Sequence, residues 1–333
     1  MSPRQRGDDG GREQRMVPRA EFRSYYGRQI LKSPVWKDDI AYYFFLGGLS
    51  AGSALLAAGG DLTDRPALRR SGRLGGLVAL IGGTYYLIAD LGRPERFHHM
   101  LRVAKPTSPM SMGTWVLSAY GGALGAAAVA EVVPARWRRL ATLTRSTARP
   151  AGLAAAVLAP AVASYTAVLL SHTAVPFWNT AKDELPFVFV GSAAASGGGL
   201  GMILAPRDQA GPARRMAVLG AVAELAAEQR MEGRLGLVGG VVHEEKPKKF
   251  LTAAKVLTAG GAVGAALFAR RSRTAAVLSG AALLAGSLCT RLGVLHAGIA
   301  STKDPKYVVG PQREELAQQE QLAQRERLSA PGR

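Results

Sequence analysis

The chain has 333 residues, of which 48% are hydrophobic and only 20% charged, and the charged residues stand in short runs between long apolar stretches. This distribution excludes an ordinary soluble domain, whose charges would be spread over its surface. The net charge of +18 comes mostly from arginine at the ends of the apolar stretches, which fits lipid headgroups better than nucleic acid. Cys289 is the single cysteine, so neither an internal disulfide nor a cluster held by several thiolates is expected.

The apolar stretches predict an all-α, polytopic membrane protein, because each is close to the ~20 residues that a helix needs to cross a bilayer. They are rich in Ala, Leu and Gly and lack the alternation of barrel strands. A polar N-terminal tail, 1–39, precedes the transmembrane domain, 40–300, and a polar C-terminal tail, 301–333, follows it. Eight spans are predicted in the domain, at about 40–60, 74–91, 113–133, 151–172, 186–205, 212–230, 251–269 and 274–296.

The first apolar run follows a long charged tail and has the length of a full span, so we expect it to stay in the membrane rather than act as a signal peptide. Gly48 and Gly52 in this span, and the run 196–201 in the fifth, place small residues where helices can approach closely. The sixth span is the weakest, because it carries Glu224 and Glu228.

An even number of spans places both tails at one end of the helices, here called the tail face. The short connections on the opposite face carry 15 Lys and Arg in 44 residues, against 9 in 54 on the tail face. The positive-inside bias therefore makes the opposite face cytoplasmic and puts both tails outside the cell membrane. The N-terminal tail, with nine Lys and Arg in 39 residues, favours the reverse.

Residues that could carry chemistry gather on the tail face, where all five histidines and three of the four tryptophans are expected. An interfacial belt explains part of the aromatic clustering. It does not explain carboxylates such as Asp90 and Glu224, which are costly in lipid, and Arg291 could pair with a carboxylate inside the protein. The histidines stand at helix ends or in loops, so the residues predict neither a haem nor a metal site in this protein.

Several motifs occur in the order found in a known family. They lie at 43–52 in the first span, 90–94 after the second, 105–111 before the third, 164–166 and 175–179 around the end of the fourth, and 297–298 and 304–305 after the eighth. Over about 34–310 the sequence resembles the NrfD-like membrane subunit of polysulfide reductase and related oxidoreductases.

The resemblance implies eight spans packed as two four-helix bundles without haem. It also implies a quinone site near the face that docks an iron–sulfur subunit, which in turn contacts a molybdopterin catalytic subunit. The chain would then be the non-catalytic or quinone-reacting subunit of such a complex. It would exchange electrons between menaquinone or ubiquinone and the iron–sulfur partner.

In the polysulfide reductase member a tyrosine of the fourth span and polar residues at the start of the first hold the quinone. Tyr165 matches that tyrosine. A quinol gives up two electrons and two protons, so its oxygens need hydrogen-bonding groups that can also move protons. We therefore expect quinone contacts from Tyr165, Asp39, Tyr43, Tyr42 and Trp115, and proton relay or tuning by Asp90, Arg93, Glu224, Arg291 and His172.

Two other functions remain open from the sequence. A proton or small-ion transporter would be expected to continue its charges toward the opposite face, whereas the carboxylates here stop near one face apart from Glu131, which is interpreted as interfacial. A purely structural membrane anchor would use the aromatic residues as a belt only.

Overall fold

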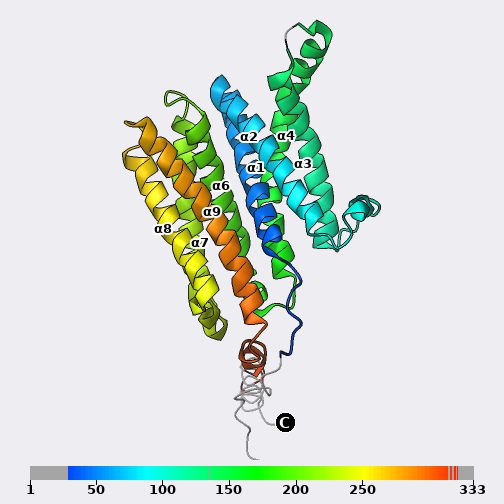
Figure 1. Ribbon diagram of the computed structural model, residues 1–333, viewed down its shortest axis with the longest axis vertical. Coiled ribbons are helices and arrows are strands. Elements are labelled where there is room, and N and C mark those ends of the chain that lie inside the picture. The colour runs from blue at the N-terminus through cyan, green and yellow to red at the C-terminus, as the bar shows by residue number, and fades with distance from the viewer. Residues whose placement is uncertain (1–28, 135, 314–315, 317–318, 320, 322–333) are drawn as a thin grey trace, which may run out of the picture.

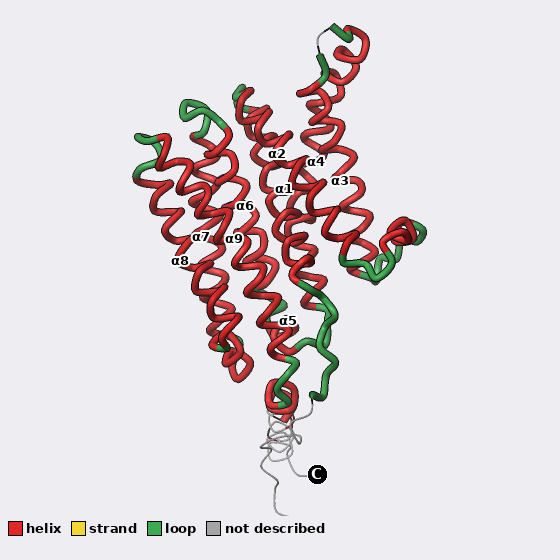
Figure 2. Tube along the Cα trace, viewed as in Figure 1, coloured by secondary structure: helices red, strands yellow, loops and turns green. Residues whose placement is uncertain are grey.

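The computed structural model describes residues 29–134, 136–313, 316, 319 and 321, so most of the predicted N-terminal tail and much of the C-terminal tail lie outside the described residues. Helices make up nearly all of the described residues, which include no strand (Figures 1 and 2). Eight helices have 20 or more residues: α1 Asp38–Leu62, α2 Pro66–Ala89, α3 Pro109–Val132, α4 Arg138–Ser171, α6 Leu185–Leu204, α7 Gly211–Arg234, α8 Glu245–Leu267 and α9 Arg273–Ser301. The shorter elements are η1 Pro94–Leu101, α5 Pro176–Thr180 and η2 Gly236–His243.

Seven of the described helices are long and apolar enough to cross a membrane, and α7 is the long helix that does not meet this standard. The predicted weakness of the sixth span is therefore confirmed. Its two carboxylates nevertheless face other helices, since Glu224 is 1% and Glu228 4% exposed. The protein is a multi-pass membrane protein whose α7 buries these two carboxylates against its neighbours.

Two helices begin well before the predicted spans that they contain. Helix α2 starts at Pro66 rather than near 74, and α4 starts at Arg138 rather than near 151. The added turns carry the arginines that were assigned to loops, and a helix can extend beyond its apolar window when such side chains find partners or water. Helix α4 also continues through Pro150 and Pro160.

The helices α1, α2, α3 and α4 are here called the first helix set, and α6, α7, α8 and α9 the second helix set (Figure 1). In the first set α1 packs on α2 and α4, and α3 packs on α4 and α2. In the second set α6 packs on α7 and α9, and α8 packs on α9 and α7. The sets meet where α1 lies against α6 and α9, and where α4 lies against α6.

Helix α6 holds this junction through a run of three glycines. A Cβ on Gly197 would lie 2.5 Å from the backbone of Gly52 on α1, and one on Gly198 would lie 2.5 Å from the backbone of Ala217 on α7. A Cβ on Gly199 would lie 2.9 Å from a carbonyl oxygen of α9. The interpretation of this run as helix packing is therefore confirmed, because any larger side chain would push three neighbouring helices away.

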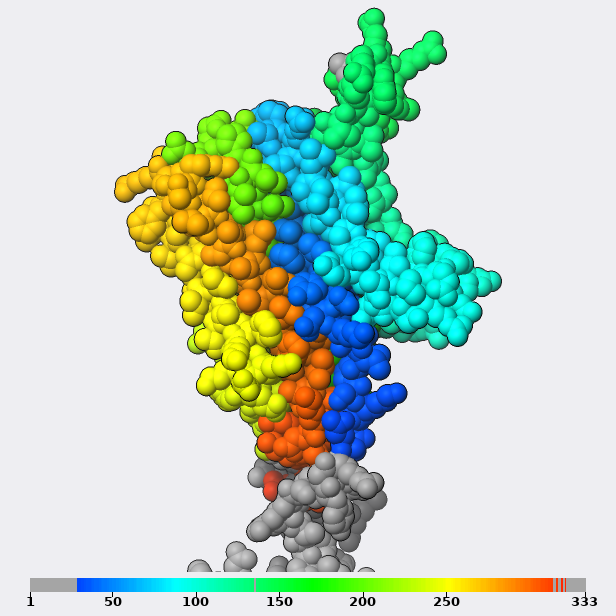
Figure 3. Space-filling view, in the orientation of Figure 1, coloured from blue at the N-terminus to red at the C-terminus, as the bar shows by residue number. Residues whose placement is uncertain are grey.

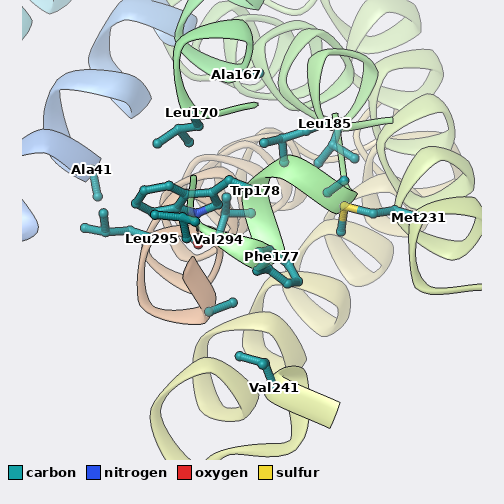
Figure 4. Packing of buried hydrophobic residues seen from close by; sticks show 14 of the residues in the cluster. Ala41, Ala167, Leu170, Phe177, Trp178, Leu185, Met231, Val241, Val294 and Leu295 are labelled. Carbon is teal, nitrogen blue, oxygen red and sulfur yellow. Dashed lines mark hydrogen bonds between the residues drawn. The ribbon is translucent and has the colours of Figure 1, made fainter. Parts of the chain in front are cut away.

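The residues just before α1 and just after α9 lie next to each other, at the tail-face end of the helices. The hydroxyls of Ser33 and Thr302 lie 2.9 Å apart there. Beside them Trp178 of α5 is fully buried and donates a hydrogen bond of 2.8 Å to the Val294 carbonyl (Figure 4). An interfacial belt does not account for Trp178, because its ring fills the core between α1, α4 and α9.

The contact between α1 and α6 generates a stability prediction. Replacing Gly52 by Ala places a methyl group 2.1 Å from the Ala193 carbonyl oxygen, so the two helices must separate. We expect Gly52→Ala to lower the free energy of unfolding by about 1–3 kcal/mol, measured by thermal unfolding in detergent. Gly47→Ala is the matched control, because its Cβ would have nothing within 4 Å on the same helix. Equal melting temperatures for the two variants would contradict the proposed role of Gly52.

Candidate functional site

A cavity of about 210 Å³ opens at the tail-face end of the first helix set. Its wall is mostly apolar, and three of the predicted site residues contribute to it: Tyr43, Asp90 and Tyr165. The full lining is Trp36, Ile40, Tyr43, Leu87, Asp90, Leu91, Met100, Met110, Thr114, Leu117, Tyr165 and Leu169. An apolar hollow with a few polar groups is the usual form of a small-molecule site.

The two tyrosines bring hydroxyl groups that no described residue uses. Neither the Tyr43 nor the Tyr165 hydroxyl has a hydrogen-bond partner within the described ranges, whereas Tyr120, deeper in the same set, bonds to Ser50 at 2.8 Å. Gly113 of α3 lies against the Tyr165 ring, where an added Cβ would overlap the ring carbons. The Tyr165 ring is thus fixed against α3 while its hydroxyl remains able to bind a ligand.

Asp90 follows the last residue of α2 and is half-buried at the cavity wall. Burial raises the pKa of its carboxyl above the usual value, and the negative charge of Asp39 raises it further. The backbone N–H and the charge of Lys37 lower the same pKa, but the net direction is upward. Asp90 is therefore protonated over a wider pH range than an exposed aspartate, so it can donate as well as accept a hydrogen bond.

Three further residues predicted to bind quinone do not line this cavity. Asp39 lies in an adjoining open groove between the starts of α1 and α8 and the end of α9. Tyr42 packs against Tyr86 of α2, with ring centroids 5.2 Å apart. Trp115 lies on the outer side of α3, where its indole N–H donates to the Val103 carbonyl at 3.4 Å. Asp39 affects the cavity only through its negative charge, which raises the pKa of Asp90.

The lining residues that the sequence did not single out include three from the stretch between the end of α2 and the second turn of α3. Met100, Met110 and Thr114 close the cavity on that side. The connection folds back through Ser111, whose hydroxyl donates to the Val103 carbonyl at 2.9 Å and accepts from the Lys105 N–H at 3.0 Å. The motif at 105–111 was the available signal, because it builds the turn that brings these side chains to the cavity.

A second apolar hollow of about 240 Å³ adjoins the first between α2, α3 and η1. The two share Leu87, Met100, Thr114 and Leu117 as lining residues. The segment that covers them projects sideways from the helices (Figure 3). Together the hollows form a path from the hydroxyl groups of Tyr43 and Tyr165 to the outer surface of α2 and α3.

The predicted tuning residues separate into two places. Arg93 and His172 are exposed, at the start of η1 and the end of α4. Glu224 and Arg291 are buried in the second helix set instead. Within the described residues no group of three or more His, Cys, Asp and Glu side chains could hold a metal ion.

Glu224 and Arg291 belong to one buried polar cluster. Thr290 of α9 donates a hydrogen bond of 2.8 Å to Glu224 of α7. The Arg291 guanidinium donates to the Phe189 carbonyl at 2.9 Å and lies 3.6 Å from the centroid of the Phe189 ring. Its positive charge also interacts with the negative charges of Glu224 and Glu228. None of these residues lines the cavity.

Seven apolar helices among the described residues define a multi-pass membrane protein, and a mostly apolar cavity with a few polar groups opens at one end of these helices. The family model described as polysulphide reductase, NrfD, matches residues 29–238. The protein therefore belongs to the NrfD polysulphide reductase family.

Two curated proteins are similar to this one, and each is named as one component of a reductase. The first belongs to the polysulfide reductase of Wolinella succinogenes and is 32% identical over 178 residues, which cover 49% of the present sequence and 56% of that protein. The second belongs to the selenate reductase of Mesobacillus selenatarsenatis and is 35% identical over 88 residues, which cover 26% of the present sequence and 20% of that protein. The match thus spans about half the length of the first relative and a fifth of the second.

The buried cluster generates a prediction about charge balance. Replacing Arg291 by Gln leaves Glu224 and Glu228 without the buried positive charge that both of them face. We expect the free energy of unfolding to fall by about 3–5 kcal/mol, seen as a lower melting temperature in detergent. The double variant Arg291→Gln with Glu224→Gln should recover part of this loss, because one uncompensated carboxylate is removed. A double variant no more stable than Arg291→Gln alone would show that charge compensation does not explain the loss of stability.

Proposed function

We propose that the protein is the quinone- or quinol-reactive membrane subunit of a multi-subunit reductase. The observation that carries the proposal is the pair of tyrosine hydroxyls, unpartnered among the described residues, beside the half-buried Asp90 in an apolar cavity. A quinone has two oxygens that accept hydrogen bonds and a flat apolar ring, and these are the needs that such a cavity meets.

In this proposal Tyr165 binds one quinone oxygen and Tyr43 the other. Asp90 lies where the cavity meets the aqueous edge, so it passes protons between the ring oxygens and water. The adjoining hollow between α2, α3 and η1 takes the isoprenoid tail, which leaves toward lipid. Both menaquinone and ubiquinone meet these requirements. Glu224 and Arg291 have a structural role and do not touch the quinone.

The partner subunits follow from the relatives' names and from the position of the cavity. Both curated relatives are named as one component of a larger reductase. We therefore infer that this protein also works in a complex, with an iron–sulfur subunit on the tail face next to the cavity and a molybdopterin catalytic subunit beyond it. The catalytic partner would determine the terminal substrate.

The membrane arrangement is part of the same proposal. We infer that α7 crosses the membrane with the other seven helices, because it runs alongside α6 and α8 and buries its carboxylates (Figure 1). The eight spans would then form two four-helix bundles in the cell membrane. The arginine-rich end would face the cytoplasm and the tail face the outside, as the positive-inside bias favours.

The role of Tyr165 can be tested by removing its hydroxyl alone. In the complex purified from membranes, Tyr165→Phe should raise the KM for quinone about tenfold, the cost of one lost hydrogen bond to a bound ligand. Tyr85→Phe, the same chemical change on an outward-facing ring of α2, is the matched control and should leave turnover unchanged. Unchanged quinone-linked turnover in Tyr165→Phe would remove Tyr165 from the site.

The role of Asp90 predicts a pH dependence. Protonated Asp90 donates a hydrogen bond to a quinone oxygen, and its ionised form cannot. Because the pKa of Asp90 is raised, affinity for oxidised quinone should be full at acid pH and should fall as the pH rises through that pKa. Asp90→Asn donates at every pH, so its affinity should stay flat in titrations of a quinone analogue. A wild-type affinity that does not change with pH would contradict this role.

A further inference from the structure

The opposite end of the first helix set contains another cavity, which is polar and which the proposed function does not use. It has a volume of about 520 Å³ and lies where α1 ends, α2 begins and α3 ends, against the first turns of α4. Its charged lining consists of Asp61, Arg69, Arg73, Glu131, Arg145 and Arg149. Two carboxylates therefore face four guanidinium groups, which leaves an excess of positive charge.

The inner part of this cavity is a closed ion network. Glu131 lies 2.9 Å from both Arg69 and Arg73, and Asp61 lies 3.2 Å from Arg73. Arg73 is only 4% exposed and also donates to the Ala148 carbonyl of α4 at 3.2 Å. Glu131, which was predicted to be interfacial, is the penultimate residue of α3, and its side chain is 9% exposed and paired with both arginines. These pairs hold the helices together and use both of the carboxylates that line the cavity.

The outer part of the cavity has positive charge without a partner. Arg145 and Arg149 are exposed, lie one turn apart on α4 and make no side-chain hydrogen bond or ion pair with any described residue. The buried Nε of Arg73 also has no partner in that part of the protein. The cavity thus has two guanidinium groups at its rim that pair with no described residue.

The surroundings of the rim are apolar. Val129 and Val132 of α3 and Leu143 of α4 belong to the helix ends that form the rim and are exposed, at 42%, 59% and 61%. Guanidinium groups bind phosphate oxygens through paired N–H donors, and a lipid phosphate at this level could leave its acyl chains against these side chains. A free phosphate ion would share the charged contacts but not the apolar ones.

We propose that this cavity binds the phosphodiester headgroup of an anionic lipid, with Arg145 and Arg149 contacting the phosphate. The bound lipid balances the excess positive charge of the network and joins α2, α3 and α4 on the side away from the second helix set. This inference does not depend on the proposed quinone site, which lies at the other end of the same helices.

The experiment compares lipid binding in two matched variants of the full-length protein. Arg145→Gln with Arg149→Gln removes the two rim charges, and Arg270→Gln with Arg271→Gln removes two exposed arginines from the α8–α9 turn at the same end of the protein (Figure 1). Each delipidated protein is titrated with phosphatidylglycerol, phosphatidylcholine or inorganic phosphate. Bound lipid is counted by native mass spectrometry while the melting temperature is recorded.

We expect phosphatidylglycerol to bind the wild type and the α8–α9 variant alike, and to bind the Arg145/Arg149 variant at least about tenfold more weakly. Phosphatidylcholine should bind all three proteins equally and weakly. An equal loss of phosphatidylglycerol binding in both variants would overturn the proposal, because general surface charge would then explain the binding. Protection by inorganic phosphate as large as that by phosphatidylglycerol would overturn the lipid assignment.

Discussion

The structure depends on the close approach of α6 to three other helices. Lipid offers no hydrophobic driving force between helices, so association there rests on tight packing of small residues. Three successive glycines on α6 meet α1, α7 and α9 in turn. This junction fixes the first helix set against the second, and with it the position of α1, which carries Tyr43 to the cavity.

From this junction the two ends of the first helix set differ in chemistry. The end near the start of α1 has tyrosine hydroxyls and one carboxyl in an apolar hollow, which suits a neutral ring with hydrogen-bonding oxygens. The other end has an ion network with excess arginine, which suits a phosphate. The second helix set instead buries Glu224, Thr290 and Arg291 in a compact cluster. The first set therefore has a candidate ligand cavity at each end, whereas the polar cluster of the second set is buried between helices.

The sequence predicts the helices well and their ends poorly. Apolar length identified every long helix, and the carboxylates correctly marked α7 as the exceptional one. The sequence could not show that α2 and α4 extend beyond their apolar stretches. Arg69 and Arg73 are typical of a loop unless Asp61 and Glu131 are known to pair with them. The burial of Trp178 could not be predicted for a similar reason, since only the tertiary structure shows α9 packed against its ring.

The candidate cavity was predicted in part. Tyr43, Asp90 and Tyr165 could be predicted because each has a hydroxyl or carboxyl group at a recognisable place in a span. Met100 and Met110 reach the cavity only through the path of the α2–α3 connection, which no periodicity reveals.

The most direct test of the account is photolabelling of the intact complex with a photoreactive quinone analogue, followed by mapping of the labelled peptides. Labels on the segment from Met100 to Met110, or on α4 around Tyr165, are predicted. Labels confined to α6–α9 would contradict a quinone site in the first helix set.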